Sequence, residues 1–281
     1  MAKKFYITTP LYYINDSPHV GSAYTTVIAD IISRWHKLKE ENVFLLTGTD
    51  ENSQKTVNAS IKLGFKEIQK YADFMAEKWT SVWKELNINH NGFIRTTENR
   101  HAEAVCDMFK RLDKKDIYKG VYKGFYCEEC ESFFTGLEAE EGNCPVHKKQ
   151  LKLIEEENYF FRLSNYQEKL LQYIEKNQNF IQPSSRRNEI LNFIKSGLKD
   201  ISISRQGMRW GITIPKEQNQ KFWVWLDALN GYRSGTKKEY WPADIHLIGK
   251  DITRPHCIIW PALLMSSKYK LPKKVFAHGF F

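Results

Sequence analysis

Long apolar runs are absent from the 281-residue sequence, and no stretch approaches the ~20 apolar residues that a membrane-spanning helix requires. Residues 1–5 also lack the apolar core of a secretory signal, because strand-like sequence begins at once. Cysteine is scarce, at five residues, and three of the five lie in one short segment. We therefore expect a reduced, cytoplasmic protein with no membrane partner.

Acidic residues are fewer than basic ones, 33 against 42, which gives a formal net charge of +9. A basic excess favours polyanionic partners such as nucleic acid, but here the basic residues are spread along the whole chain. Charge alone therefore does not choose a partner. The length fits one or two domains.

Helix-like and strand-like stretches alternate through the first part of the chain. The strand-like stretches are 5–8, 42–47 and 92–96, and the helix-like ones are 23–38, 68–86 and 105–112. The helix over 23–38 places seven apolar residues on one face: Ala23, Val27, Ile28, Ile31, Ile32, Trp35 and Leu38. This order predicts an α/β protein with a doubly wound, mostly parallel sheet.

The alternation stops after residue 115. Residues 116–158 are aromatic, punctuated by glycine and bear the cysteine cluster, and two helical stretches follow at 165–176 and 186–196. Strand and helix alternation then resumes at 221–225, 245–249, 256–268 and 274–277. We therefore expect one α/β domain that is interrupted by a small metal-bearing insertion.

Four residues of this insertion have the spacing of a zinc site: Cys127, Cys130, Cys144 and His147. They form two pairs, each with two intervening residues, and each pair can sit on a tight turn. Chance clustering is the alternative, which the equal spacing at both ends disfavours. Because four protein ligands leave no open position, the ion would be structural. The remaining cysteines, Cys106 and Cys257, lie in helical patterns and are expected to be packing residues.

The segment around His19 has the layout of a phosphate-binding corner. The first strand-like stretch breaks at Pro10, passes through turn residues 15–18 and reaches His19, Gly21 and Ser22 as the next helix begins. In α/β proteins, this order presents backbone N–H groups and a helix dipole to phosphate. Gly21 would let a nucleotide approach the backbone closely, and His19 can hydrogen-bond a phosphate oxygen.

Other segments near the carboxyl edges of expected strands converge on the same crevice: 48–50, 247–252 and an aromatic segment over 222–232. Each candidate residue there has a structural alternative. Asp50 can equally be a helix N-cap. Trp225 and Tyr232 can be ordinary core aromatics, and His256 can be a cap or a solvated residue.

Distinctive runs extend nearly from end to end of the chain: YITTPLYYIN, PHVGS, LLTGTDE, FIRTTE, the cysteine/histidine knuckle, NYFFRL, ISISR, WGI, VWLDAL, LIGKDI and PHCIIWPALL. Together they resemble the methionyl-tRNA synthetase family of class I aminoacyl-tRNA synthetases. The resemblance implies a Rossmann-type doubly wound parallel sheet that is split by a zinc-knuckle connective insertion. Residues 1–115 and 223–281 would form the two halves of the catalytic domain, and 116–222 the insertion.

The resemblance implies a methionine–tRNA ligase that works in two steps. The methionine carboxylate attacks the α-phosphate of ATP, which enters with Mg²⁺, and forms methionyl-adenylate and pyrophosphate. A terminal ribose hydroxyl of tRNA(Met) then receives the methionyl group. Such chemistry needs positioning and charge stabilisation more than a protein nucleophile. No DNA partner is implied.

The resemblance also assigns the nucleotide site. His19 and Gly21 stand in the family's HIGH motif, where they contact ATP, and Gly249 and Asp251 match positions near the adenosine ribose. The fourth position of the motif is normally histidine, but here it is Ser22. A serine hydroxyl can still donate to phosphate, yet it is shorter than imidazole and cannot become cationic. Losing such a donor costs ~3 kcal/mol of transition-state stabilisation where nothing replaces it.

The same resemblance assigns the amino-acid site. Asp50 matches the carboxylate that holds the substrate ammonium group. Seven residues match the pocket around the thioether side chain: Leu11, Tyr13, Trp225, Ala228, Tyr232, Ile252 and His256. Aromatic walls suit a polarisable sulfur.

Some features leave alternatives open. Asn52 and Ser53 replace the His-Gly of the family's TGTDEHG motif, and the sequence stops where the family continues into its lysine-bearing KMSKS loop. The chain is then either a piece of a longer synthetase or a truncated paralogue that binds tRNA or protein without catalysis. Class I synthetases for leucine, isoleucine, valine or cysteine are a further alternative. Residues 116–222 leave little room for the editing domain that several of them need.

Overall fold

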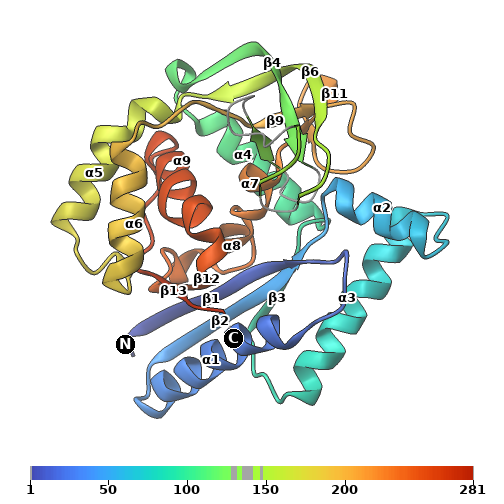
Figure 1. The fold of residues 1–281 in the computed structure, drawn as a ribbon. Coiled ribbons are helices and arrows are strands. Elements are labelled where there is room, and N and C mark those ends of the chain that lie inside the picture. Colours follow the sequence, from blue (N-terminus) through green and yellow to red (C-terminus); the bar gives the residue numbers. More distant parts are fainter. Residues whose placement is uncertain (1, 128–131, 135–141, 146–147, 281) are drawn as a thin grey trace.

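The central element of the computed structural model is a parallel sheet of six strands, in the order β3-β2-β1-β12-β13-β7 (Figure 1). The structure describes residues 2–127, 132–134, 142–145 and 148–280. The strands of this sheet are β1 (Lys4–Tyr13), β2 (Asn42–Asp50), β3 (Gly92–Arg95), β7 (Ile181–Gln182), β12 (Ile245–Gly249) and β13 (Val275–His278). The predicted α/β fold with a parallel sheet is confirmed.

Helices cover both faces of this sheet. They are α1 (Val20–Leu38), α2 (Gln54–Lys62), α3 (Ile68–Glu85), α4 (Asn99–Arg111), α5 (Gln167–Lys176), α6 (Ser184–Lys195), α7 (Val224–Ala228), α8 (Gly231–Ser234) and α9 (Trp260–Ser266). Single turns are η1 (Lys114–Asp116), η2 (Leu163–Tyr166), η3 (Lys238–Tyr240), η4 (Lys250–Ile252) and η5 (Pro255–Ile259). Side chains alternate along β1, so Phe5 and Ile7 pack with Ala29 of α1, whereas Tyr6 belongs to the larger core on the α9 side. No helix among the described residues is long and apolar enough to cross a bilayer.

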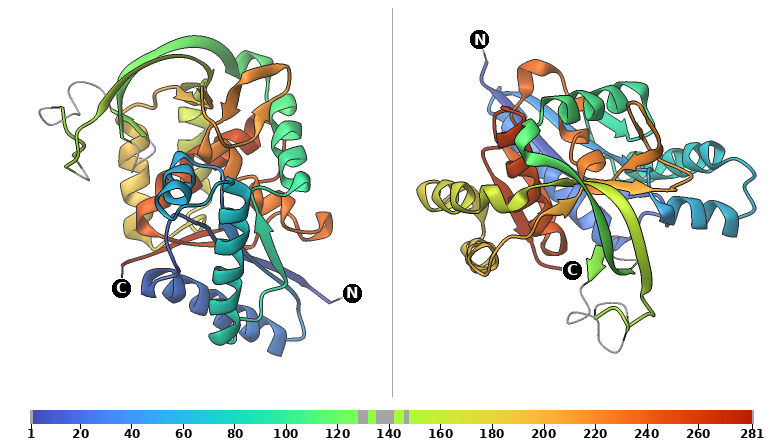
Figure 2. Two further views of the ribbon diagram at one scale, coloured as in Figure 1. Left: turned by 90° about the vertical axis from the view of Figure 1, so that its right-hand side faces the viewer. Right: turned by 90° about the horizontal axis from the view of Figure 1, so that it is seen from above.

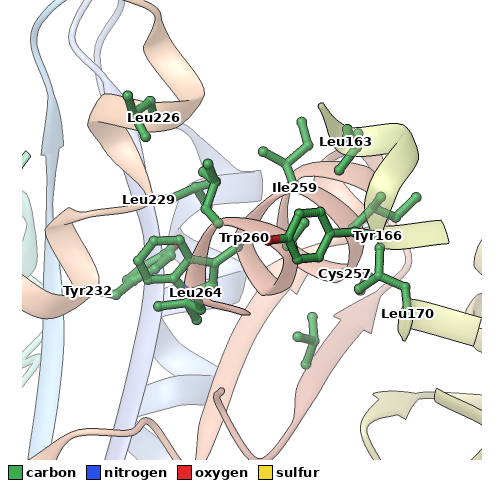
Figure 3. Close-up of a cluster of buried hydrophobic side chains, with 14 of the residues drawn as sticks. Leu163, Tyr166, Leu170, Leu226, Leu229, Tyr232, Cys257, Ile259, Trp260 and Leu264 are labelled. Atoms are coloured by element: carbon green, nitrogen blue, oxygen red, sulfur yellow. The ribbon is translucent and has the colours of Figure 1, made fainter. Parts of the chain in front are cut away.

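The larger core is centred on α9 (Figure 3). Trp260 and Leu264 of α9 lie between two groups of buried side chains, as the figure shows: Leu226, Leu229 and Tyr232 on one side, and Leu163, Tyr166 and Leu170 on the other. Cys257 is fully buried in the same core and Cys106 packs against it. Both therefore are the packing residues that the sequence predicts.

The helix α1 was predicted, but only part of its apolar face packs inward, where Ile28 and Ile32 lie against the cluster that contains Phe5 and Ile7. Six small or polar side chains face inward: Ser22, Thr25, Thr26, Ala29, Asp30 and Ser33. Ile31, Trp35 and Leu38 are instead exposed. Several of the inward polar groups have specific partners: Asp30 accepts from Arg34 and from the N–H of Asn89, and the Thr26 hydroxyl donates to the carbonyl of Ser22. Polar side chains therefore share this interface with apolar ones, which apolar periodicity alone does not predict.

Two antiparallel sheets lie beyond the main sheet. One contains β4 (Ile117–Cys127), β5 (Ser132–Phe134), β6 (Lys152–Phe161) and β8 (Ile201–Ser202), and the other β9 (Ser204–Gln206), β10 (Thr213–Ile214) and β11 (Glu217–Phe222). Strands β4 and β6 form a long, curved antiparallel pair (Figure 2). Both sheets fall within 116–222, the range predicted as the insertion. Strand β7 and the helices α5 and α6 also fall in this range, and β7 pairs with β13 of the main sheet. The predicted domain boundaries stay a prediction.

The strand predicted over 221–225 is confirmed only for Lys221 and Phe222 and is wrong for the rest. Strand β11 ends at Phe222 and pairs antiparallel with β9, and Val224 already begins α7. The run Phe-Trp-Val-Trp-Leu is apolar throughout, and such a short run does not distinguish a strand from a buried helix.

Gly48 of β2 lies so close to β3 that an added Cβ there would be 2.0 Å from the carbonyl oxygen of Ile94. We expect Gly48→Ala to push the strands apart and to lower the free energy of unfolding by ~3 kcal/mol. The strand glycine Gly120 is the matched control, since its nearest neighbours would lie 3.4 Å or more from an added Cβ. Urea denaturation measures both variants, and equal losses would contradict the steric account.

Candidate functional site

A cleft of about 610 Å³ opens at the carboxyl edge of the main sheet. Its walls come from the end of β1 and the loop into α1, the last residue of β2, the helices α7 and α8, and the segment after β12. The structure brings together here all residues predicted for methionine and ATP: Leu11, Tyr13, His19, Gly21, Ser22, Asp50, Trp225, Ala228, Tyr232, Gly249, Asp251, Ile252 and His256. The ligand of each residue stays a prediction.

His19 caps the N-terminus of α1 with its own side chain. Its Nδ1 accepts a hydrogen bond from the backbone N–H of Gly21 at 3.1 Å, so a neutral His19 ring carries its hydrogen on Nε2. An added Cβ at Gly21 would lie 3.0 Å from Cε1 of this ring, so glycine avoids a steric clash with the ring in this position. This corner can therefore offer a bound anion the Nε2–H donor of His19 and, beside it, the backbone N–H groups at the start of α1.

Ser22 and Ser53, two departures from the family's motifs, serve as helix caps. The Ser22 hydroxyl accepts from the N–H of His19 at 2.9 Å and donates to the carbonyl of His19 at 2.7 Å. Ser53 accepts from the N–H of Thr56 at the start of α2, at 3.2 Å. Because serine has a single O–H, Ser22 can donate to a phosphate only after its bond to the His19 carbonyl breaks.

Asp50 is the last residue of β2, and its side chain lines the cleft although the residue is only 2% exposed. The alternative that Asp50 is a helix N-cap is wrong, because Ser53 caps α2. Burial, with the neighbouring Tyr12 and Asp50 groups, raises the pKa of Tyr232 far above its usual range. A nearly buried carboxylate beside aromatic rings is chemically suited to a small ammonium group.

Tyr232 and His256 form a directed hydrogen-bond chain in the cleft wall. His256 Nδ1 lies 2.8 Å from the carbonyl of Ile252, which can only accept, so Nδ1 is the donor. Nε2 of the neutral ring must then accept from the Tyr232 hydroxyl, at 2.6 Å. His256 is 2% exposed, and the alternative of a cap or a solvated residue is wrong. The tyrosine hydroxyl is thereby turned toward His256.

Some residues that line the cleft were not singled out from the sequence. The rings of Tyr12 and Trp79 stack with 4.8 Å between their centroids. Helical periodicity marks Trp79 only as part of the apolar face of α3, and nothing local shows that this face reaches the cleft. His278 at the end of β13 also lines the cleft, and its Nε2 lies 2.7 Å from the Thr25 hydroxyl. Their positions depend on tertiary contacts that sequence spacing does not show.

The predicted metal site is described in part. Cys127 and Cys144 lie in one small buried cluster with Leu151. The other two predicted ligands, Cys130 and His147, lie outside the described residues. Among the residues that the structure does describe, no group of three or more potential metal ligands occurs. The zinc site therefore stays a prediction.

The backbones of both described cysteines have defined partners. Cys127 ends β4 and pairs with Ser132 of β5. The N–H of Cys144 donates to the carbonyl of Lys149, and the N–H of Lys148 donates back to the carbonyl of Cys144, both at 2.8 Å.

Comparisons with known proteins point to one family. A family model described as tRNA synthetases class I (M) matches residues 5–155 and 137–281. The methionine–tRNA ligase of Thermotoga maritima is 48% identical over 289 residues, which cover 98% of this chain and 46% of that protein. The ligase of Streptomyces coelicolor is 45% identical, over 99% of this chain and 55% of the relative.

Solved structures agree with this. The structure of Mycobacterium tuberculosis methionyl-tRNA synthetase in complex with methionyl-adenylate matches with a TM-score of 0.94 and 38% identity, over 99% of this chain and 57% of that one. The chain thus spans about half the length of the relatives it matches.

The buried histidines predict a pH-dependent stability. Burial lowers the pKa of His256 from 6.5 to about 4. Between these values the unfolded chain binds a proton that the folded protein does not, so the free energy of unfolding falls as pH falls. We expect His256→Gln to remove up to ~3 kcal/mol of this fall between pH 6.5 and 4. Urea denaturation across this range measures it, and an unchanged pH slope would contradict the assignment.

Proposed function

The chain belongs to the family of class I tRNA synthetases (M), and we therefore propose that the protein carrying it is a methionine–tRNA ligase. The cleft would bind methionine and ATP with Mg²⁺ and join them into methionyl-adenylate. Transfer of the methionyl group to tRNA(Met) would follow. One observation carries this proposal: a nearly buried carboxylate, an aromatic wall and a helix N-terminus line a single cleft.

The methionine end of the cleft is proposed at Asp50 and the aromatic wall. Asp50 would hold the α-ammonium group through a charge-assisted hydrogen bond. The thioether would lie among the side chains of Leu11, Tyr13, Trp225, Ala228, Tyr232, Ile252 and His256, all of which line the cleft. Because the Tyr232 hydroxyl is already bonded to His256, this wall offers the sulfur mainly ring surface.

The nucleotide end is proposed at the start of α1 and the end of β12. His19 Nε2–H and the helix N-terminus would stabilise negative charge on the phosphates as the carboxylate attacks. Gly249 and Asp251 would hold the ribose. An added Cβ at Gly249 would lie 2.5 Å from Oδ1 of Asp251, so glycine is what allows this carboxylate its position.

Partners and compartment follow from the same proposal. The net charge of +9 is compatible with tRNA, a polyanion. Class I synthetases of this kind work in translation, and we propose a cytoplasmic location for this one.

We further propose that Cys127, Cys130, Cys144 and His147 hold one structural zinc ion. The support is the burial of Cys127 and Cys144 in one small cluster, together with the equal spacing of the two pairs in the sequence. Three thiolates and an imidazole fit tetrahedral Zn²⁺ without an open position. The ion would hold the tip of the β4–β6 region and take no part in the reaction.

Zinc content tests this site. We expect about one zinc per chain by plasma mass spectrometry, and a loss of most of it in Cys144→Ser, because a thiolate ligand is removed. Cys257→Ser is the control, since Cys257 is buried in the α9 core far along the chain from the cluster. Equal zinc content in all three proteins, or none in the unmodified one, would contradict the site.

Methionine-dependent ATP–pyrophosphate exchange by the complete gene product tests the activity. We expect Asp50→Asn to raise the KM for methionine ~100-fold, because a charge-assisted hydrogen bond to the ammonium group is weakened. The KM for ATP should change little. Exchange with leucine in place of methionine would support a different synthetase, and no exchange would favour the non-catalytic alternative.

A further inference from the structure

Behind the aromatic wall lies a row of four hydrogen-bonded side chains: Asn52, Asp227, His101 and Ser234. None of them lines the cleft. We propose that Asp227 is a positioning residue for the methionine pocket, held in place by Asn52 and His101. This inference rests on the proposed function and deepens it. It assigns the residues that hold α7 and α8, the two helices of the aromatic wall, in position.

The carboxylate of Asp227 is fully buried and has a donor on each oxygen. Oδ1 lies 2.6 Å from Nε2 of His101, and Oδ2 accepts from Nδ2 of Asn52 at 3.0 Å. His101 is fully buried too, and its Nδ1 lies 2.8 Å from the hydroxyl of Ser234. A carboxylate removed from water needs such partners, since loss of one leaves a costly unpaired charge.

The four residues come from four different elements around the pocket. Asp227 is on α7 between Trp225 and Ala228, which both line the cleft. Ser234 ends α8, the helix that carries Tyr232. His101 is on α4, so its ring connects both α7 and α8 to α4 through hydrogen bonds.

The fourth element is the segment that follows Asp50. Asn52 stands two residues after that carboxylate, so the row joins the proposed ammonium site to the aromatic wall. Its Nδ2 carries two hydrogens, and it donates to Asp227 and also to the carbonyl of Thr96 at 2.9 Å. A neutral histidine has one ring N–H and could not serve both acceptors. The replacement of histidine by Asn52 therefore suits this row of hydrogen bonds.

Serine, histidine and aspartate are also the residue types of a hydrolytic triad. The burial of His101 and Asp227 and the position of all three outside the cleft argue against that role, because a nucleophile must meet its substrate. A positioning role needs no access. The helices α7 and α8 have only five and four residues, and helices this short rely on tertiary contacts for their place.

The test compares Asn52→Ala and Asp227→Asn with the unmodified protein, all as the complete gene product. Asn52→Ala removes the hydrogen bond from Asn52 to α7, and Asp227→Asn removes the negative charge that both donors meet. Asn52→Ala serves alone if Asp227→Asn does not fold. We expect the KM for methionine to rise about tenfold in ATP–pyrophosphate exchange, with the KM for ATP and kcat within about twofold.

Asp116→Asn is the matched control. Asp116 is another buried carboxylate, which accepts from Tyr166 and Ser266, and neither it nor these partners line the cleft. We expect it to lower the melting temperature and leave the KM for methionine within about twofold. If Asp227 has a merely structural role, Asn52→Ala and Asp227→Asn will also lower the melting temperature and leave the KM for methionine unchanged, or they will raise the KM for methionine and the KM for ATP equally. Either result overturns the proposal.

Hydrogen exchange of residues 223–235 without ligand decides the matter independently of activity. We expect the amides of α7 and α8 to exchange at least tenfold faster in Asn52→Ala, and unchanged in Asp116→Asn. Unchanged exchange in Asn52→Ala would overturn the positioning role. If the unmodified protein does not activate methionine, the proposed function fails, while the exchange result still decides whether this row positions the wall.

Discussion

The parallel pairing of β1 with both β2 and β12 is the contact on which the rest of the structure depends. It aligns Ile7 with Ile245, so two segments far apart in the chain become neighbours in one sheet. The backbone of Tyr6 exchanges hydrogen bonds with Asp244, and the Tyr6 hydroxyl donates to the carbonyl of Tyr232 at 2.6 Å. Through these bonds the pairing brings the loop before α1, the end of β2 and the aromatic wall to one edge. The cleft exists because these strand ends coincide.

Around the cleft, the polar side chains are held by the protein before any ligand arrives. His19 is turned by the N–H of Gly21, and His256 by the carbonyl of Ile252. Each bond selects one ring tautomer, and the tautomer decides whether the other ring nitrogen is a donor or an acceptor. Donors and acceptors oriented in this way need little reorganisation on binding, which is how a site favours a charged transition state. The same logic extends to Asp227, whose partners lie one layer behind the wall.

The sequence predicted the sheet, most helices and the grouping of the cleft residues, because strand ends and turn residues follow local rules. It failed where tertiary contacts decide. The residues from Val224 to Leu226 look like part of a strand but lie in α7, and α1 buries serine and threonine while Ile31, Trp35 and Leu38 of its apolar face are exposed. The bond between His101 and Asp227 joins residues 126 positions apart, and no spacing rule shows such a pair. Recognition of the family supplied the residue roles, which local rules alone did not.

A crystal structure of the complete protein with a stable analogue of methionyl-adenylate tests the central claim most directly. The account predicts the ammonium group at Asp50, the thioether against Trp225 and Tyr232, and the phosphate near His19 at the start of α1. A ligand bound elsewhere, or one bound here with its amino group away from Asp50, would contradict it.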